Sequence, residues 1–209
     1  MAGKRPDDHD SKKNRLRRSA ALLLMDNRPG AASIPNICRE AGLTPQTVHY
    51  YFDNRDNLIR DVVHGHMTRL LKRVEDDTPE DLPPLDRLYA MARAYAAVIE
   101  MRIPDHRTVL GHAQFLPKAR HGDVRMMQRW LLHAVAGMVR DVAPHVPRER
   151  IMPLALSLLA MLNAHATWFK EGGGLRRAGY VDMVVRMVLS EASGAALGGE
   201  PAPASCAAD

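Results

Sequence analysis

The chain alternates between segments whose apolar residues are spaced three and four apart and short breaks rich in proline and glycine. Residues three and four apart share one face of an α-helix, whereas a half-buried strand alternates every second residue. No convincing run of alternating β-branched residues is present. The pattern therefore predicts an all-α fold, with helices at about 13–26, 34–41, 45–52, 54–73, 84–102, 105–116, 121–142, 148–170 and 178–192.

A length of 209 residues suffices for a core that needs no disulfide. The chain has only two cysteines, Cys38 and Cys206, and its charged N-terminal stretch lacks the apolar segment of a signal peptide. Residues 151–169 approach the length of a membrane span but include Pro153, Asn163 and other polar residues, which favours a buried helix. We therefore expect a cytoplasmic protein that does not enter a membrane.

The basic charge lies mainly in the first part of the chain. The net charge is +5, and residues 1–60 hold 11 Lys and Arg against 7 Asp and Glu, so they carry +4 of it. A basic segment favours an anionic partner such as nucleic acid.

Residues 33–52 have the pattern of a helix-turn-helix. Ser33 can cap the first helix, Gly42 provides the turn, and Thr44 with Pro45 begins the second helix. Leu43 and Val48 stand at the two positions of a hydrophobic staple. Two short helices joined in this way can place the second helix in a DNA major groove.

The second helix carries polar and aromatic side chains suited to DNA. Gln46 can bind an adenine edge, Thr47 can contact a base or a phosphate, and Tyr50 and Tyr51 can reach bases or backbone. Ser33, Thr44 and Arg55 lie at helix starts, where phosphate is readily bound. The alternative interpretation, an amphipathic core helix with packed tyrosines, is less consistent with the basic segment and the coincident start signals.

The stretch "SIPNICREAGLTPQTVHYYFDNRDNLIRDVV" at 33–63 resembles the DNA-binding half of TetR-type transcriptional regulators. In this pattern a tyrosine that contacts phosphate usually stands where this chain has His49, and a lysine usually stands where it has Arg55. The resemblance thus implies DNA contacts from Ser33, Thr44, Pro45, Gln46, Thr47, His49, Tyr50, Tyr51 and Arg55. An imidazole at position 49 would make its contact pH-dependent.

The resemblance also implies a domain organisation. We expect a mobile arm at 1–12, a three-helix DNA-binding domain at 13–62, a helical ligand-binding and dimerisation domain at 63–192, and a disordered tail at 193–209. The helices near 148–170 and 178–192 are too apolar for a small monomer, and in the family the last two helices form the homodimer. The expected partner is double-stranded operator DNA, and the expected role is that of a ligand-released repressor.

The segments "RTVLGHAQFLPKAR", "QRWLLHAVAGMVRDV" and "ATWFKEGGGL" resemble the branch of these regulators that responds to coenzyme A thioesters of fatty, aromatic or steroid-derived acids. An acyl group needs an apolar tunnel and the nucleotide part needs cations. The candidate contacts are Tyr89, Arg107, Phe115, Met126, Met127, Trp130, Met161 and Trp168. Such residues are also common in ordinary cores, and Trp168 could equally pack in a dimer.

Other functions find little support in the sequence. The ten histidines lack the i, i+4 spacing that places two metal ligands on one helix face, and no nucleophile motif, phosphate-binding glycine loop or carboxylate pair is visible. We expect no metal, no cofactor and no enzymatic activity. The alternatives are a small helical enzyme with a basic surface, which substrate turnover would reveal, and a protein-binding adaptor, which a gel shift would distinguish.

Overall fold

A computed structural model of the chain describes residues 6–25, 30–112, 122–169 and 174–192. These residues form nine α-helices and no strand, which confirms the all-α prediction. The helices are α1 (Pro6–Met25), α2 (Ile34–Ala41), α3 (Pro45–Phe52), α4 (Arg55–Asp77), α5 (Pro84–Met101), α6 (Ile103–His112), α7 (Gly122–Val142), α8 (Arg148–Trp168) and α9 (Arg177–Ala192).

Helix α1 begins at Pro6, well before the predicted start at residue 13. Proline is well tolerated in the first turn, because the backbone N–H that it lacks has no partner inside the helix there. The charged composition of this stretch therefore does not prevent helix formation.

Helix α4 extends to Asp77, past the predicted end near Arg73. Two ion pairs at i, i+4 spacing support the added turn, Lys72–Asp76 at 3.2 Å and Arg73–Asp77 at 2.6 Å. The hydroxyl of Thr78 then donates to the carbonyl of Val74 at 2.6 Å where the helix ends.

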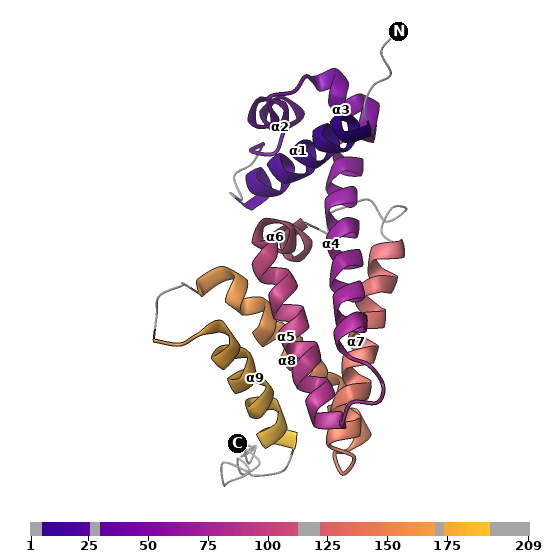
Figure 1. Ribbon diagram of the computed structural model, residues 1–209, viewed down its shortest axis with the longest axis vertical. Coiled ribbons are helices and arrows are strands. Elements are labelled where there is room, and N and C mark those ends of the chain that lie inside the picture. Colours follow the sequence, from indigo (N-terminus) through magenta and orange to yellow (C-terminus); the bar gives the residue numbers. More distant parts are fainter. Residues whose placement is uncertain (1–5, 26–29, 113–121, 170–173, 193–209) are drawn as a thin grey trace, which may run out of the picture.

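The three N-terminal helices and the start of α4 form one small bundle (Figure 1). Leu16 of α1, Ile37 of α2, Val48 of α3 and Leu58 of α4 each have 0% of their surface exposed. Burying an aliphatic side chain of this size contributes roughly 1.5–3 kcal/mol relative to leaving it in water. The core of this bundle holds α2 and α3 in fixed positions relative to α4.

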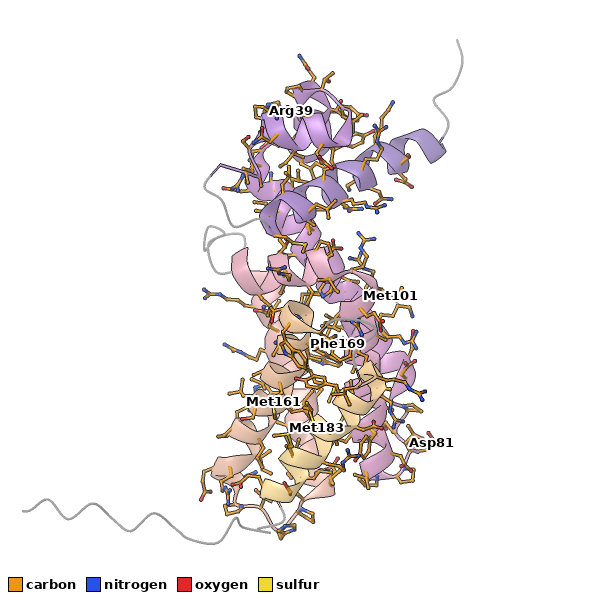
Figure 2. The ribbon with its side chains drawn as sticks, turned by 90° about the vertical axis from the view of Figure 1, so that its left-hand side faces the viewer. Arg39, Asp81, Met101, Met161, Phe169 and Met183 are labelled. Carbon is orange, nitrogen blue, oxygen red and sulfur yellow. The ribbon has the colours of Figure 1, made fainter. Side chains whose placement is uncertain are left out.

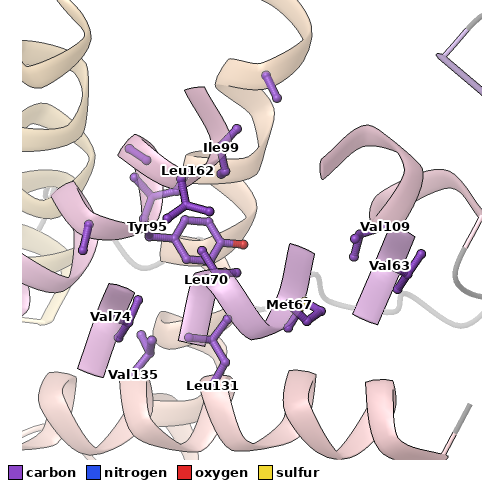
Figure 3. Packing of buried hydrophobic residues seen from close by; sticks show 14 of the residues in the cluster. Val63, Met67, Leu70, Val74, Tyr95, Ile99, Val109, Leu131, Val135 and Leu162 are labelled. Atoms are coloured by element: carbon purple, nitrogen blue, oxygen red, sulfur yellow. The ribbon is translucent and has the colours of Figure 1, made fainter. Parts of the chain in front are cut away.

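Helix α4 runs from this bundle into the larger C-terminal half, where it packs against α5, α6 and α7 (Figure 1). Helix α6 lies between the two halves and packs against both α1 and α4. The C-terminal core is apolar around Tyr95, with Leu70 and Leu162 beside its ring and Met67, Val109 and Leu131 on neighbouring helices (Figure 3).

Helix α8 is long and apolar enough to cross a membrane by length and composition alone. In this fold one side of it is buried against α5, α7 and α9, through residues that include Leu154, Leu158 and Leu162. Its length and apolar composition are therefore accounted for by packing inside a helical domain.

Candidate nucleic-acid interface and ligand cavity

The turn between α2 and α3 requires glycine. Gly42 has φ +59°, and a Cβ at this position would lie 3.0 Å from Nη2 of Arg15. Arg15, on α1, donates a hydrogen bond from the same nitrogen to the carbonyl of Ala41, the last residue of α2. This turn therefore fixes the angle at which α3 leaves α2.

Helix α3 has one buried edge and one exposed face. Val48 and Phe52 are buried, whereas the predicted DNA contacts are exposed or half-buried. Exposed contacts are Thr44, Pro45, Gln46, His49 and Tyr50, and half-buried contacts are Thr47 and Tyr51. Tyr50 leaves 70% of its surface exposed, so its ring and hydroxyl are accessible to a partner.

Two contacts order the side chains on this face. The rings of Tyr50 and Tyr51 meet edge to face, with centroids 5.0 Å apart. Thr44 is the residue before α3, as predicted, but its hydroxyl lies 3.2 Å from the hydroxyl of Thr47 and makes no capping bond to the backbone. The two threonine hydroxyls are therefore paired with each other at the start of the exposed face.

His49 has a defined ring orientation. Its Nδ1 lies 2.7 Å from the carbonyl oxygen of Asp53, the residue with φ +66° that follows α3. A carbonyl oxygen only accepts hydrogen bonds, so Nδ1 carries the proton and the neutral ring leaves Nε2 unprotonated. His49 can therefore donate from Nε2 to a phosphate only when the ring is protonated at both nitrogens.

Ser33 is the N-cap of α2, and the side chain of Arg55, the first residue of α4, reaches the same point. Nε of Arg55 donates to the carbonyl of Ala32 at 2.6 Å, and the hydroxyl of Ser33 accepts from the backbone N–H of Asn36 at 3.4 Å. These bonds tie α4 to the N-terminus of α2 while the side chains of both residues stay half-buried at the surface. Arg39, exposed on α2, is a further cation at this end of the molecule (Figure 2).

The predicted ligand contacts are spread over several faces. Met126 and Trp130 on α7 are 68% and 51% exposed, and Trp168 at the end of α8 is 53% exposed and stacks edge-on against Tyr180 at 5.2 Å. The others that the structure describes, Tyr89, Arg107, Met127 and Met161, are half-buried on four different helices. Phe115 lies outside the described residues.

A cavity of about 300 Å³ lies between α4, α5, α6, α7 and α8. Its lining is apolar except for four side chains, and none of the predicted contacts that the structure describes is part of it. The lining residues are Met67, Leu70, Tyr95, His106, Val109, Leu110, Gln128, Leu131, Leu132, Leu156, Leu159, Ala160 and Asn163. A volume of this order accommodates a small organic group.

A chain of hydrogen bonds forms the polar end of this cavity. The hydroxyl of Tyr95 donates to Oδ1 of Asn163 at 2.6 Å, and Nε2 of His106 lies 3.1 Å from the same oxygen. Nδ1 of His106 in turn lies 3.1 Å from Nε2 of His66. Burial lowers the pKa of His106 to about 4 and that of His66 to about 3, so both rings are neutral at pH 7.

Sequence reasoning missed this polar cluster because His66, Tyr95, His106 and Asn163 come from four helices and share no local spacing. One signal was present, since Asn163 is an amide inside a mostly apolar helix. Among the side chains that the structure describes, no group of three or more His, Cys, Asp or Glu could hold a metal ion.

A second hollow, of about 450 Å³, lies between α1, α4 and α6. Five arginines and two aspartates contribute to its wall: Arg15, Arg17, Arg18, Arg69, Arg102, Asp61 and Asp105. The carboxylate of Asp105 is 5% exposed and accepts from Arg69 at 2.8 Å and from Arg102 at 3.0 Å. Arg17 pairs with Asp61, which joins α1 to α4.

Comparison with protein families gives a match over residues 81–192 to the family described as "Tetracyclin repressor-like, C-terminal domain". Comparison with curated protein sequences yields no match.

Several solved structures share the fold. The regulator PfmR from Thermus thermophilus is 21% identical, with a TM-score of 0.70 over 82% of this chain and 97% of that chain. The ketosteroid regulator KstR2 of Mycobacterium tuberculosis is 17% identical, with a TM-score of 0.76 over 91% and 97%. AibR, in a complex with isovaleryl coenzyme A and operator DNA, is 17% identical, with a TM-score of 0.74 over 84% and 97%.

Proposed function

The chain belongs to the TetR family of transcriptional regulators, and we propose that it is a homodimeric repressor that a small-molecule ligand releases from a palindromic operator. The observation that carries this proposal is the exposed face of α3, which presents Gln46, Thr47, Tyr50 and Tyr51 from a helix fixed by its buried edge. Members of this family are DNA-binding regulators and not enzymes.

Base recognition is assigned to α3 and phosphate contacts to its surroundings. Gln46 offers an amide that can pair with adenine in the major groove, and Tyr50 extends from the same face. Ser33, Thr44 and Arg55 lie at helix starts beside this face, where backbone N–H groups and a guanidinium suit phosphate. We also include Pro45 and His49, which lie on the same surface, among the proposed DNA contacts.

Dimerisation is assigned to α8 and α9. Leu156 on α8 and Met183 and Met187 on α9 leave 50%, 37% and 53% of their surfaces exposed. Met161 and Met183 lie in the half of the molecule opposite to Arg39 (Figure 2). A second copy that covers these helices would place two α3 helices on one side of the dimer, and two-fold DNA sites require them roughly 34–36 Å apart.

For the ligand we propose a coenzyme A thioester. The cavity beside Tyr95 offers an apolar space for an acyl group, and the fold is shared with AibR, whose structure contains isovaleryl coenzyme A. Arg107, half-buried on α6 one residue after cavity-lining His106, is a cation available to the nucleotide part.

Helix α4 can connect ligand binding to DNA binding. Its first turn is bonded to the start of α2 through Arg55, and its later residues Met67 and Leu70 line the cavity. A ligand that displaces α4 would therefore change the separation of the two α3 helices. Helix α6 offers a second connection, because His106 lines the cavity and Asp105 holds Arg69 and Arg102 beside α1.

A gel-shift experiment tests this proposal. The full-length protein is mixed with the DNA upstream of its own reading frame, and acyl coenzyme A thioesters of increasing acyl length are added. We expect a shift that a specific competitor removes and that at least one thioester abolishes. Binding of the DNA that no thioester affects would contradict the proposed ligand class, and an absence of any shift would contradict an operator in this DNA.

A further inference from the structure

The cavity beside Tyr95 has one polar end, and the direction of each hydrogen bond there is fixed by chemistry. Oδ1 of Asn163 can only accept, so Tyr95 donates its O–H and His106 donates from Nε2. A neutral His106 then has an unprotonated Nδ1, which accepts from Nε2 of His66. Nδ1 of His66 is left as a buried acceptor without a partner among the described residues, so the chain of donors ends there.

The distance from Tyr95 to Asn163 supports this orientation of the amide. The two atoms are 2.6 Å apart, which is typical of an O–H···O bond and shorter than the usual 2.9–3.0 Å of an N–H···O bond. Oδ1 of Asn163 therefore receives both hydrogen bonds, and the amide nitrogen occupies the other position.

The amide nitrogen of Asn163 is the group left over. Nδ2 makes no hydrogen bond within the described residues. It is also not fully buried, because it is absent from the fully buried polar atoms that lack a partner. Asn163 is half-buried and lines the cavity. The side chain is held by two bonds to its oxygen, so its two N–H donors have a defined direction before any ligand arrives.

The remaining lining restricts the charge of an occupant. Apart from Tyr95, His106, Asn163 and Gln128, the described lining is made of Met, Leu, Val and Ala. No Lys, Arg, Asp or Glu is among these lining residues, so a carboxylate or an ammonium would lose its hydration without a charged partner. The amide oxygen of Asn163 is also not available to a donor group on the ligand, because Oδ1 already accepts two hydrogen bonds.

We propose that this cavity selects neutral ligand groups that carry a hydrogen-bond acceptor, such as a ketone or thioester carbonyl, and that Nδ2 of Asn163 donates to that acceptor. The inference rests on the proposed ligand response and specifies the chemistry of the group that is buried. Tyr95 and His106 act as positioning residues, because they hold the amide and do not themselves donate to the ligand.

Three probes that share a cyclohexyl group test the proposal: cyclohexyl methyl ketone, 1-cyclohexylethylamine and cyclohexanecarboxylate. Binding to the full-length protein at pH 7 is followed by ligand-observed NMR. We expect the ketone to bind at least about tenfold more tightly than either charged probe, a factor typical of one well-placed hydrogen bond together with avoided desolvation. The infrared carbonyl band of the bound ketone should also shift to lower frequency than in cyclohexane.

The variant Asn163→Asp keeps an oxygen that accepts from Tyr95 and His106 but replaces the N–H donors with a second oxygen. We expect it to lose the ketone preference and to favour the amine, with thermal unfolding used to verify that it folds. Asn14→Asp is the matched control, because it makes the same chemical change at an exposed position of α1, outside this cavity. It should leave the ketone as the preferred probe.

Equal affinities for the three probes, no binding of any probe, or a preference of the parent protein for the amine would each overturn the proposal. An unshifted carbonyl band in the parent protein would do so independently of how the variant folds. The readout is binding to free protein and involves no DNA. A ketone preference with no thioester effect on operator binding would therefore contradict the proposed ligand class and leave the acceptor selection intact.

Discussion

At the scale of single residues, several properties of this protein depend on where one proton lies. In His49 the carbonyl of Asp53 fixes the proton on Nδ1, and in the cavity the oxygen of Asn163 fixes the tautomers of His106 and His66. These assignments follow from the fact that carbonyl and amide oxygens can only accept. Each of them leads to an observable dependence on pH or on ligand chemistry.

Operator affinity should depend on the protonation of His49. Only the doubly protonated ring can donate from Nε2 to phosphate, so binding should be stronger in acidic buffer than in alkaline buffer. The variant His49→Tyr can donate a hydroxyl in both buffers, and its affinity should lose most of this dependence. Fluorescence anisotropy with labelled operator measures the affinity of the parent and of the variant. Parallel pH profiles for the two proteins would exclude a phosphate contact from His49.

The stability of the fold should fall in mild acid because of the two buried rings. The pKa of His66, about 3, and that of His106, about 4, lie below the unfolded value near 6.5, so the unfolded chain binds more protons below that value. Stability from this source is fully present above pH 6.5. Between pH 7 and pH 5 each ring should cost on the order of 1–2 kcal/mol of unfolding free energy.

Urea unfolding at a series of pH values measures this loss. His66→Gln keeps a side-chain N–H that can donate towards His106 but cannot titrate, so it should reduce the slope of stability against pH by about one proton. Arg69, Arg102 and Asp105 lie near the pair and stay unchanged in this variant. The same substitution at exposed His133 is the control, and an unaltered slope in His66→Gln would refute the assignment.

At this scale the sequence predicted the DNA-facing side chains better than the cavity. The exposure of Gln46 and Tyr50 follows from helical spacing around Val48 and Phe52, which is a local property. The contact between His106 and Asn163 joins residues 57 positions apart and depends on how α6 packs on α8. No spacing rule contains that information.

At the scale of elements, the helices were predictable because their starts and ends are set locally. Ser33 caps α2, Gly42 ends it, and Pro45 begins α3, all as expected. The start of α1 and the end of α4 were predicted wrongly, and at the end of α4 two i, i+4 ion pairs support an extra turn that apolar periodicity does not reveal. The predicted end of the helix at 105–116 and the predicted start of the helix at 121–142 fall on residues 113–121, which lie outside the described residues.

Gly42→Ala should destabilise the helix-turn-helix. Its φ of +59° disfavours any residue with a Cβ, and the new methyl would lie 3.0 Å from the guanidinium of Arg15, which holds the end of α2. We expect a loss on the order of 1–2 kcal/mol in unfolding free energy, together with weaker operator binding.

Gly111→Ala is the matched control for Gly42→Ala. Gly111 lies in α6, has no positive φ, and no atom lies within 4 Å of the added Cβ. Alanine there should leave stability equal or slightly higher, because it has the greater helix propensity. Similar stability changes for the two variants in urea unfolding would argue against a special role for the turn.

At the scale of the whole molecule, the proposed dimer would cover the apolar side chains left exposed on α8 and α9. Met183→Glu combined with Met187→Glu would place two carboxylates on this surface and should convert the protein to a monomer in sedimentation experiments. Met126→Glu, at a residue that is 68% exposed on α7, is the control and should leave the dimer intact. A double variant that still sediments as a dimer would place the interface elsewhere.

The arrangement of the helices in the whole molecule was also only partly predictable from the sequence. Apolar excess in the last two helices indicated an interface, and polar content in 151–169 argued for a buried helix, but the cavity between α4 and α8 is created by five helices together. Its polar end depends on how four helices of the C-terminal half pack together, and the arginine-lined hollow beside α1 depends on the arrangement of both halves. Such features arise from tertiary packing and have no counterpart in local sequence patterns.

The central claim is that the exposed face of α3 reads the operator. Quantitative binding of the parent protein, Gln46→Ala and Tyr50→Ala to one operator fragment tests it most directly, with Trp130→Ala, an exposed aromatic on α7, as the control. Each α3 variant should remain a dimer and lose roughly 1–3 kcal/mol of specific binding, about fivefold to 150-fold in affinity. If both α3 variants bind the operator as tightly as the parent and the control, α3 is not the reading helix.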